Sequence, residues 1–407
     1  MKTAETPKAP SPQSTASDVL GQNIAVAAER LRNIAAVERA RLKILAGWFL
    51  RIGDFETKYK LAYHLYDASE HITWIRTRLQ EMRGGNTNAS VRPDLVNLLE
   101  NALHAPSDTD FLAGFYGVLT SDLAESIRVD LKKMDTSANA NEIRILQRTL
   151  SDLDVQLDWY HSLNIDLNAS AWALQIQALS RSIGGIHGET KQGPTPPPIT
   201  GERFERPTTI LFDDSIQTGQ LESYANRQQM DPQQATIEQF KVFFNEFYAA
   251  ALLAGILFDA PEGLYPWEFF ADFSRHFWDE TRHSEFGANR LRELGVNPSK
   301  VNPVLFEESQ GLPILHRVTY LTRGLEAYFM PRKPKRMKEY QNNGDMRSQI
   351  FADHDWSDEI NHVRYGSRWT NHLLENDHRE IDDVIEEVKS HLSKIRNTEV
   401  TTIEAPF

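Results

Sequence analysis

The 407-residue chain contains no cysteine. That absence excludes disulfides, iron–sulfur clusters, thiolate zinc sites and cysteine nucleophiles. No window approaches 18 uninterrupted apolar residues, and the N-terminus lacks the apolar core of a secretory signal, so we predict a cytoplasmic protein with no membrane span. Basic residues are fewer than acidic ones, with 44 Lys and Arg against 57 Asp and Glu. The formal net charge of −13 argues against nucleic acid and anionic membranes as partners.

Strand patterns are sparse as well. Apolar residues, which make up 40% of the chain, recur instead at spacings of three and four, as is typical of packed helices. We predict an all-α fold. The expected helices cover 21–52, 55–83, 109–133, 138–164, 168–183, 234–259, 265–294, 312–332 and 346–375, with one more in the charged tail.

Composition divides the chain into units. Residues 1–20 are small, polar and Pro-rich, and we expect them to be disordered. Residues 184–233 include PTPPP and several glycines, which indicates a long connector. It separates a helical unit over 21–183 from a second one over 234–378, and 379–407 form a C-terminal helix and tail.

Two segments, HFWDETRHSEFG (276–287) and DWSDEINHVRYG (355–366), carry the same short motif. In each, a glutamate precedes a histidine by three positions: Glu280 with His283, and Glu359 with His362. Residues three apart share one helix face and can hold one ion, although a mixed-charge surface helix gives the same pattern. A third copy, Glu375 with His378, lies in a polar helix end, where we expect it to be solvated.

Each motif follows a helix with one acid in an apolar setting. Glu246 precedes Glu280 by 34 residues, and Glu326 precedes Glu359 by 33. A four-helix di-metal site needs this combination of two lone glutamates and two Glu-x-x-His pairs. The four carboxylates sum to −4, which two divalent cations neutralise, and ligands rich in oxygen favour iron or manganese. The alternative is four unconnected acids on helix surfaces.

The second half, over 234–375, therefore resembles the ferritin-like di-iron carboxylate superfamily. Its oxygen-activating members include bacterial multicomponent monooxygenases, ribonucleotide reductase small subunits and acyl-carrier desaturases. Many carry Asp-Glu-x-Arg-His, which stands here as DETRH (279–283), whereas DEINH (358–362) has Asn361 in place of Arg. The resemblance implies that Asp279 and Asp358 accept hydrogen bonds from the ligand imidazoles. It also implies that Arg282 pairs with an acidic neighbour, although an exposed charge is equally compatible with the sequence.

The first half looks like an eroded copy of the second. Four short segments match in the same order, among them HLYDASEHITWIRTRL (64–79) with HFWDETRHSEFGANRL (276–291). Only two of the six ligand positions survive, as Glu38 and His71, and the other four are Ala68, Ala124, Leu153 and Gln156. We therefore predict two ferritin-like four-helix bundles in tandem, forming an internal pseudo-dimer. We expect no metal in the first bundle, where Glu38 and His71 are ordinary polar residues.

The resemblance implies a pair of iron ions that activates O₂, although Mn/Fe and Mn/Mn pairs accept the same ligands. We expect four residues about one turn from the ligands to line the cavity as catalytic groups: His276, Arg323, Asp355 and Tyr365. Each is equally compatible with a satisfied core residue. Arg323 would clamp an anion, which favours a small polar or carboxylate-bearing substrate.

Three functions remain open. The first is an O₂-dependent di-iron oxidase or oxygenase, with O₂, a small-molecule substrate and an electron donor as partners. The second is a ferroxidase or a redox protein similar to manganese catalase, and the third is a non-catalytic helical scaffold. The protein is expected to be a monomer or a homodimer.

Overall fold

The computed structural model describes residues 20–83, 86, 87, 89, 91–198, 202–375 and 379–398, and the fold is all-α as predicted. Residues 1–19 of the expected disordered segment, His378 and the end of the tail lie outside the described residues. The first half contains α1 (Ile24–Arg51), α2 (Phe55–Glu81), α3 (Pro93–Asn101), α4 (Asp108–Gly114), η1 (Phe115–Thr120), α5 (Ser121–Lys132), α6 (Ala140–Ser162), η2 (Leu167–Ala169) and α7 (Ala171–Ile183).

The connector carries β1 (Gln217–Thr218) and α8 (Tyr224–Arg227). The second half contains α9 (Pro232–Phe244), α10 (Phe247–Asp259), α11 (Trp267–Glu293), β2 (Lys300–Val301), α12 (Val304–Glu307), α13 (Ile314–Thr319), η3 (Tyr320–Glu326), α14 (Ala327–Phe329), η4 (Met330–Arg332), α15 (Lys333–Asn342), α16 (Met346–Leu374) and α17 (Ile381–Thr398).

Several of the helices begin at side chains that cap them. Asn23, Asp54, Ser170 and Asp345 each accept a hydrogen bond from a backbone N–H in the first turn of α1, α2, α7 and α16. At the other end of α7, Gly184 adopts a left-handed conformation with φ 83°, which closes the helix. These local signals explain why most predicted helices agree with the structure to within three residues.

One predicted helix, 234–259, is not continuous. It breaks into α9 and α10 at Asn245 and Glu246, where the Glu246 N–H bonds to the carbonyl of Phe243, three residues back. The break lies against α11, because Gly287 lets the backbone of Phe244 approach so closely that an added Cβ would lie 2.1 Å from its nitrogen. Ser284 on α11 also donates to the Phe244 carbonyl at 2.8 Å. The prediction of an unbroken helix was wrong, and Glu246 stands at the kink.

Within the described residues, each half contains one π-helical segment, η1 in the first and η3 in the second. Both segments continue from an α-helix, because the residues on either side of them keep a right-handed helical conformation. Wider turns of this kind occur often at functional sites. Here η3 ends on Glu326, one of the predicted ligands.

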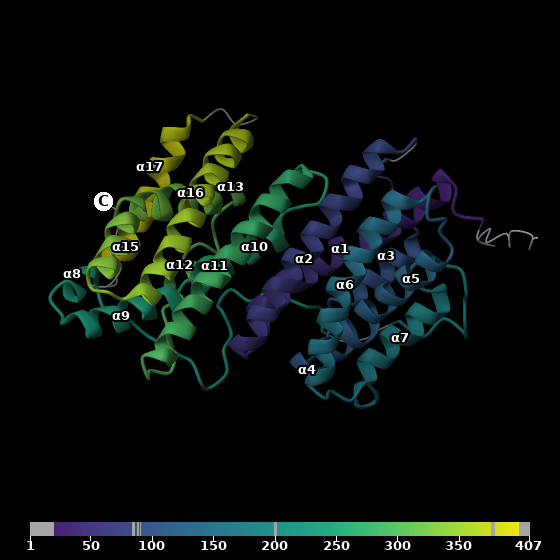
Figure 1. Ribbon diagram of the computed structural model, residues 1–407, viewed down its shortest axis with the longest axis horizontal. Coiled ribbons are helices and arrows are strands. Elements are labelled where there is room, and N and C mark those ends of the chain that lie inside the picture. Colours follow the sequence, from purple (N-terminus) through teal and green to yellow (C-terminus); the bar gives the residue numbers. More distant parts are fainter. Residues whose placement is uncertain are drawn as a thin grey trace, which may run out of the picture.

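The two halves lie at opposite ends of an elongated molecule, with α1 and α2 packed against α10 and α11 between them (Figure 1). Aromatic side chains fill this interface. Phe49 packs edge-on against Phe277, with ring centroids 4.8 Å apart, and Tyr59 stacks on Phe247 at 5.3 Å. This contact places the first half as a wall behind the helices that carry the predicted ligands.

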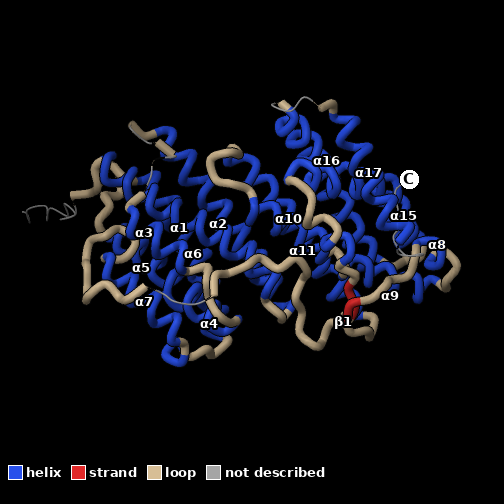
Figure 2. The backbone as a smooth tube through the Cα atoms, turned by 180° about the vertical axis from the view of Figure 1, so that it is seen from behind, coloured by secondary structure: helices blue, strands red, loops and turns tan. Residues whose placement is uncertain are grey.

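The connector runs along the outside of both halves (Figure 2). Its backbone bonds to the first half at Leu50 and Gly53, and β1 pairs with β2 in parallel in the second. Arg206 forms an ion pair with Asp259 at 3.0 Å. The connector therefore holds the halves together as well as linking them.

Residues Pro232–Asp259, which include α9 and α10, are long and apolar enough to cross a membrane by composition. However, 72% of their most apolar window is buried inside the protein, as in a core helix.

Candidate metal centre

Acidic and imidazole side chains from four segments meet in the second half. They come from the α9–α10 kink, α11, η3 and α16, and their ligand atoms form three groups, each within 4.8 Å. The groups are His276, Glu280, Glu326 and His362; Glu246, His283 and Asp355; and Glu280, His283 and Glu359. Glu280 and His283 each belong to two groups, so the three groups adjoin.

All six predicted ligands therefore lie in one place, and two more residues join them. His276 and Asp355 were expected to line a cavity, but both belong to the ligand groups. The His276 Nε2 atom lies 2.7 Å from Glu326 Oε1, and His283 Nδ1 lies 3.6 Å from Asp355 Oδ1. Buried groups of this kind can hold a metal ion.

Each residue predicted to bind metal keeps one buried oxygen or nitrogen atom without a hydrogen bond in the described part of the chain. Each of the six predicted ligands has one buried side-chain atom with no hydrogen-bond partner among the described residues: Glu246 Oε2, Glu280 Oε1, His283 Nδ1, Glu326 Oε2, Glu359 Oε2 and His362 Nδ1. A buried polar atom without a partner costs free energy. Bound cations would satisfy all six atoms at once, so the residues fit a metal centre.

The two histidines predicted as ligands, His283 and His362, each contact the aspartate of the other's motif. His283 Nε2 lies 3.2 Å from Asp358 Oδ2, and His362 Nε2 lies 3.4 Å from Asp279 Oδ2. Each Nδ1 therefore faces the carboxylates, with His362 Nδ1 3.1 Å from Glu280 Oε1. The sequence identified both aspartates, but it did not show that the pairing crosses between α11 and α16. Such outer contacts fix the tautomer and direction of a ligand imidazole.

Two arginines of α11 support both aspartates. Arg282 donates to Asp279 at 2.6 Å and to Asp358 at 3.2 Å, so it pairs with acidic neighbours as the resemblance implied. Arg275, which the sequence analysis did not single out, donates to Asp279 at 2.9 Å and lies 3.7 Å from Asp358. Because α11 supplies both guanidinium groups, Asn361 at the corresponding place on α16 leaves neither aspartate without a partner.

Lys333, at the start of α15, is a residue that the sequence analysis missed. Its buried ammonium nitrogen lies 2.7 Å from Asp355 Oδ1 and 2.8 Å from Glu359 Oε1. Asp355 adds one negative charge to the four glutamates, and Lys333 adds one positive charge. The side chains at the centre still sum to −4, the charge that two divalent cations balance.

Two of the four glutamates have raised pKa values. Burial raises the pKa of Glu246 to about 7 and also raises that of Glu326. Burial acts the same way on Glu359, but the charge of Lys333 and the contact with His362 together bring its pKa down to about 2. Glu246 and Glu326 therefore resist ionisation, and further cations would remove that resistance.

A glycine follows each ligand histidine by four positions, Gly287 on α11 and Gly366 on α16. A Cβ on Gly366 would lie 2.1 Å from the Thr322 side chain, just as one on Gly287 would meet Phe244. At both places the helix that carries the lone glutamate approaches. The glycines thus set the depth of Glu246 and Glu326, and both stand in the quoted segments as a repeated signal.

The other two predicted catalytic residues, Arg323 and Tyr365, do not belong to the ligand groups and do not line the cavity beside them. Arg323 donates to the hydroxyl of Ser367 at 2.7 Å and does not line the cavity beside the ligands. Its expected role as an anion clamp is not supported by this placement. The Tyr365 ring lies 6.5 Å from the His276 ring, centroid to centroid, behind the ligands rather than on the cavity wall.

The first half repeats the same geometry without the ligand set. His71 Nδ1 lies 2.8 Å from Glu38 Oε1, and its Nε2 lies 3.1 Å from Asp152. Gln156 donates to Asp67 at 2.9 Å. Asp67 and Asp152 stand where Asp279 and Asp358 stand in the second half.

A protein cation lies in the middle of this network. Arg41 donates to Glu38 at 2.6 Å and also bonds to Gln156, and its side chain is fully buried. The guanidinium group supplies positive charge beside Glu38 and His71. Glu38 and His71 are therefore buried residues paired with protein groups, as expected of ordinary polar residues.

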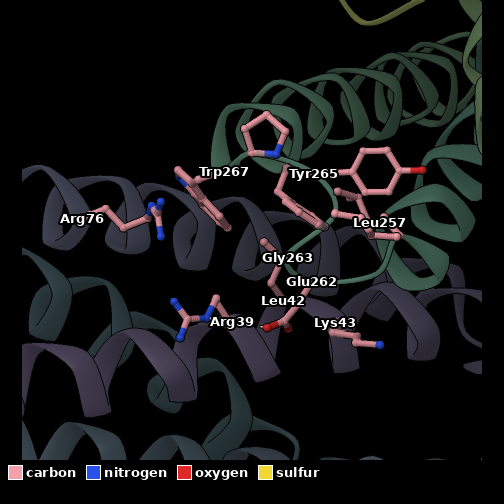
Figure 3. Close-up of a pocket in the computed structure, with 13 residues that line it drawn as sticks. Arg39, Leu42, Lys43, Arg76, Leu257, Glu262, Gly263, Tyr265 and Trp267 are labelled. Carbon is pink, nitrogen blue, oxygen red and sulfur yellow. Dashed lines mark ion pairs between the residues drawn. The ribbon is translucent and has the colours of Figure 1, made fainter. Parts of the chain in front are cut away.

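A cavity of about 140 Å³ adjoins the ligand groups. It is lined by the four glutamates predicted as ligands, by Lys333 and Tyr248, and on another side by apolar residues. Burial and the surrounding carboxylates raise the pKa of Tyr248 well above its ordinary value, so its hydroxyl keeps its proton. A larger cavity of about 450 Å³ lies between the halves, around Arg39, Arg76 and Trp267 (Figure 3), but none of the ligand residues lines it.

A model of the family described as "Protein of unknown function (DUF455)" matches residues 166–407, which is more than half of the chain and includes every residue of the centre. No curated protein and no solved structure matches the chain.

Proposed function

The chain belongs to the DUF455 family, and from the centre in its second half we propose that it is an O₂-dependent di-metal oxidoreductase that oxidises a small organic molecule. Iron is the preferred metal, because three imidazoles and five carboxylates form a donor set rich in oxygen. Mn/Fe and Mn/Mn pairs are compatible with the same donors.

One observation carries the proposal: six buried donor atoms from four segments lack hydrogen bonds and lie in adjoining groups. A structural salt-bridge network would pair these atoms with protein donors, as Arg41 does in the first half. In the second half, Lys333 bonds to Asp355 and Glu359, and Arg336 lies 3.9 Å from Asp355. Among the described residues, neither cation bonds to any of the six unpaired atoms.

For the fold, we propose two ferritin-like bundles in tandem, the first without metal. Three observations support a duplication: the crossed contacts to aspartates, the π segments η1 and η3 at corresponding places in the two halves, and the repeated sequence segments. The first bundle then serves as a packing partner that walls off the active one.

Two bound irons would supply electrons for the reduction of O₂. The chain's own groups do the rest. Asp279 and Asp358 hold the Nε2 protons of the ligand histidines, so that each Nδ1 is free to bind a metal. Lys333 holds Asp355 and Glu359 in place, and the hydroxyl of Tyr248 keeps a proton at the cavity wall. The apolar side chains of that wall exclude water.

The test is anaerobic loading with ferrous iron followed by exposure to O₂, with metal content and oxygen uptake as readouts. We expect two irons per chain and oxygen uptake that depends on them, both lost in Glu280→Ala. Glu375→Ala is the matched control, because Glu375 belongs to the third Glu-x-x-His and is 67% exposed.

The competing functions give different results. Rapid disproportionation of hydrogen peroxide would favour a protein similar to manganese catalase, and turnover of iron alone would favour a ferroxidase. Absence of bound metal under all loading conditions would favour a scaffold and overturn the proposal.

A further inference from the structure

The cavity beside the metal centre continues towards the surface through a set of arginines. Arg227, Arg332 and Arg336 line it, and the same three residues line an adjoining pocket of about 180 Å³. They form the shared wall of the two spaces, which we call the arginine neck. Arg227 comes from α8 of the connector, Arg332 from η4, and Arg336 from α15.

Resting on the proposed function, we propose that this cavity binds a small organic carboxylate whose head lies on the arginine neck and whose apolar chain extends towards the ligand groups.

The inner space suits a short apolar chain. Its wall includes Val242, Ala249, Leu321, Leu325 and Phe329, and the ligand glutamates lie on another side. A volume of about 140 Å³ corresponds to roughly four or five water molecules. A chain of a few carbons fits, whereas a nucleotide or a large ring does not.

The arginine planes are held by aromatic rings. The Arg332 guanidinium lies 4.7 Å from the Tyr224 ring centroid and 5.3 Å from that of Phe329, and Arg336 lies 5.4 Å from that of Phe243. Such stacking fixes the plane of a guanidinium group, whose five N–H donors can bind a carboxylate alongside other partners. Arg332 also donates to the Tyr328 hydroxyl at 3.3 Å.

Charge also favours an anion at the neck. With two divalent cations bound, Lys333 and the five carboxylates of the centre are neutralised. Beyond them, three arginines line the two spaces, against Glu222 in the inner one and Glu339 in the outer one. Arg336 Nη1 lies 3.9 Å from Asp355 Oδ2, which links the neck to the centre. A cationic ligand would have to pass all three guanidinium groups.

Isothermal titration calorimetry with hexanoate tests the proposal. Hexan-1-ol and hexylamine serve as comparison ligands, since they have the same chain length but a neutral or a positively charged head group. Each titration is made on the purified full-length protein before and after metal loading. We expect hexanoate to bind at least ten times more tightly than either of the other probes. Arg332→Gln and Arg336→Gln should each weaken hexanoate binding about tenfold or more, with the melting temperature used to confirm folding.

Arg323→Gln is the matched control, because Arg323 bonds to Ser367 away from the cavity, and its affinity for hexanoate should equal that of the unmodified protein. Equal affinity for hexanoate and hexan-1-ol, or the same loss in Arg323→Gln as in the neck variants, would overturn the proposal. Hexanoate binding in a protein that takes up no metal would refute the proposed function and leave the carboxylate site standing. Metal-dependent oxygen uptake without hexanoate binding would do the reverse.

Discussion

The ammonium nitrogen of Lys333 lies 2.7 Å from Oδ1 of Asp355, inside the cluster of metal-ligand candidates. The two charges cancel, so the centre keeps the net charge of the four glutamates alone. Lys333 thus allows a fifth carboxylate to be buried at the centre without a third metal ion.

Replacing Lys333 with Met should destabilise the metal-free protein by about 3–5 kcal/mol, because it leaves Asp355 and Glu359 without their buried cation. Urea unfolding of metal-free protein measures the loss. The double variant Lys333→Met with Asp355→Asn restores the charge balance and should recover part of the stability. If the single variant unfolds at the same urea concentration as the unmodified protein, Lys333 does not neutralise the cluster.

Arg41→Met should also destabilise by about 3–5 kcal/mol, because Glu38 stays buried without its guanidinium partner. Adding Glu38→Gln removes the uncompensated charge and should recover part of that loss. Metal content should not change in either variant, since both residues lie in the first half. A loss of metal in Arg41→Met would show instead that the first half supports the metal centre through the interface.

His71 should make stability depend on pH. Burial lowers the pKa of its imidazole, but the charge of Glu38 and the hydrogen bonds to Asp152 and Glu38 together raise the pKa to about 9. A raised native pKa means that the folded state binds the extra proton, so the stabilisation is complete below pH 6.5 and is lost as pH rises to 9. The loss is on the order of 3 kcal/mol.

The difference in unfolding free energy between the unmodified protein and His71→Gln isolates this effect. The subtraction matters because burial lowers the pKa of Lys58 to about 7, which makes stability rise with pH over part of the same range. A difference that stays constant from pH 6 to 9.5 would show that His71 is not protonated in the folded protein.

Gly287→Ala should destabilise by at least about 1–3 kcal/mol, because the new Cβ would lie 2.1 Å from the Phe244 backbone nitrogen. It should also weaken metal binding by displacing Glu246. Gly255→Ala is the control, since its Cβ would meet nothing closer than 3.6 Å and alanine favours a helix. Thermal unfolding of both variants decides; equal melting temperatures would contradict the close packing of α9 on α11.

The sequence predicted most of the helices and the six candidate ligands that the structure brings together. Periodicity and capping are local signals, and one helix face fixes Glu280 with His283 and Glu359 with His362. The role of Lys333 could not be predicted from the sequence, since its position depends on how α15 packs against α16 after Pro331. The crossed pairing of the aspartates is likewise a contact between helices.

Arg323 was misplaced for a different reason. Arg323, three residues before Glu326, would lie about one turn away in an α-helix, but both residues lie in the wider π segment η3. The extra residue per turn rotates the Arg323 side chain towards Ser367. The kink at Glu246 was missed because it depends on close contact with Gly287 on another helix.

Anomalous X-ray diffraction at the iron edge, from crystals of protein loaded with ferrous iron, tests the central claim most directly. The account predicts two peaks in the second half, one among His276, Glu326 and His362 and one among Glu246, His283 and Glu359, and none beside Arg41. No peak at these ligands, or a peak beside Glu38 and His71 instead, would contradict it.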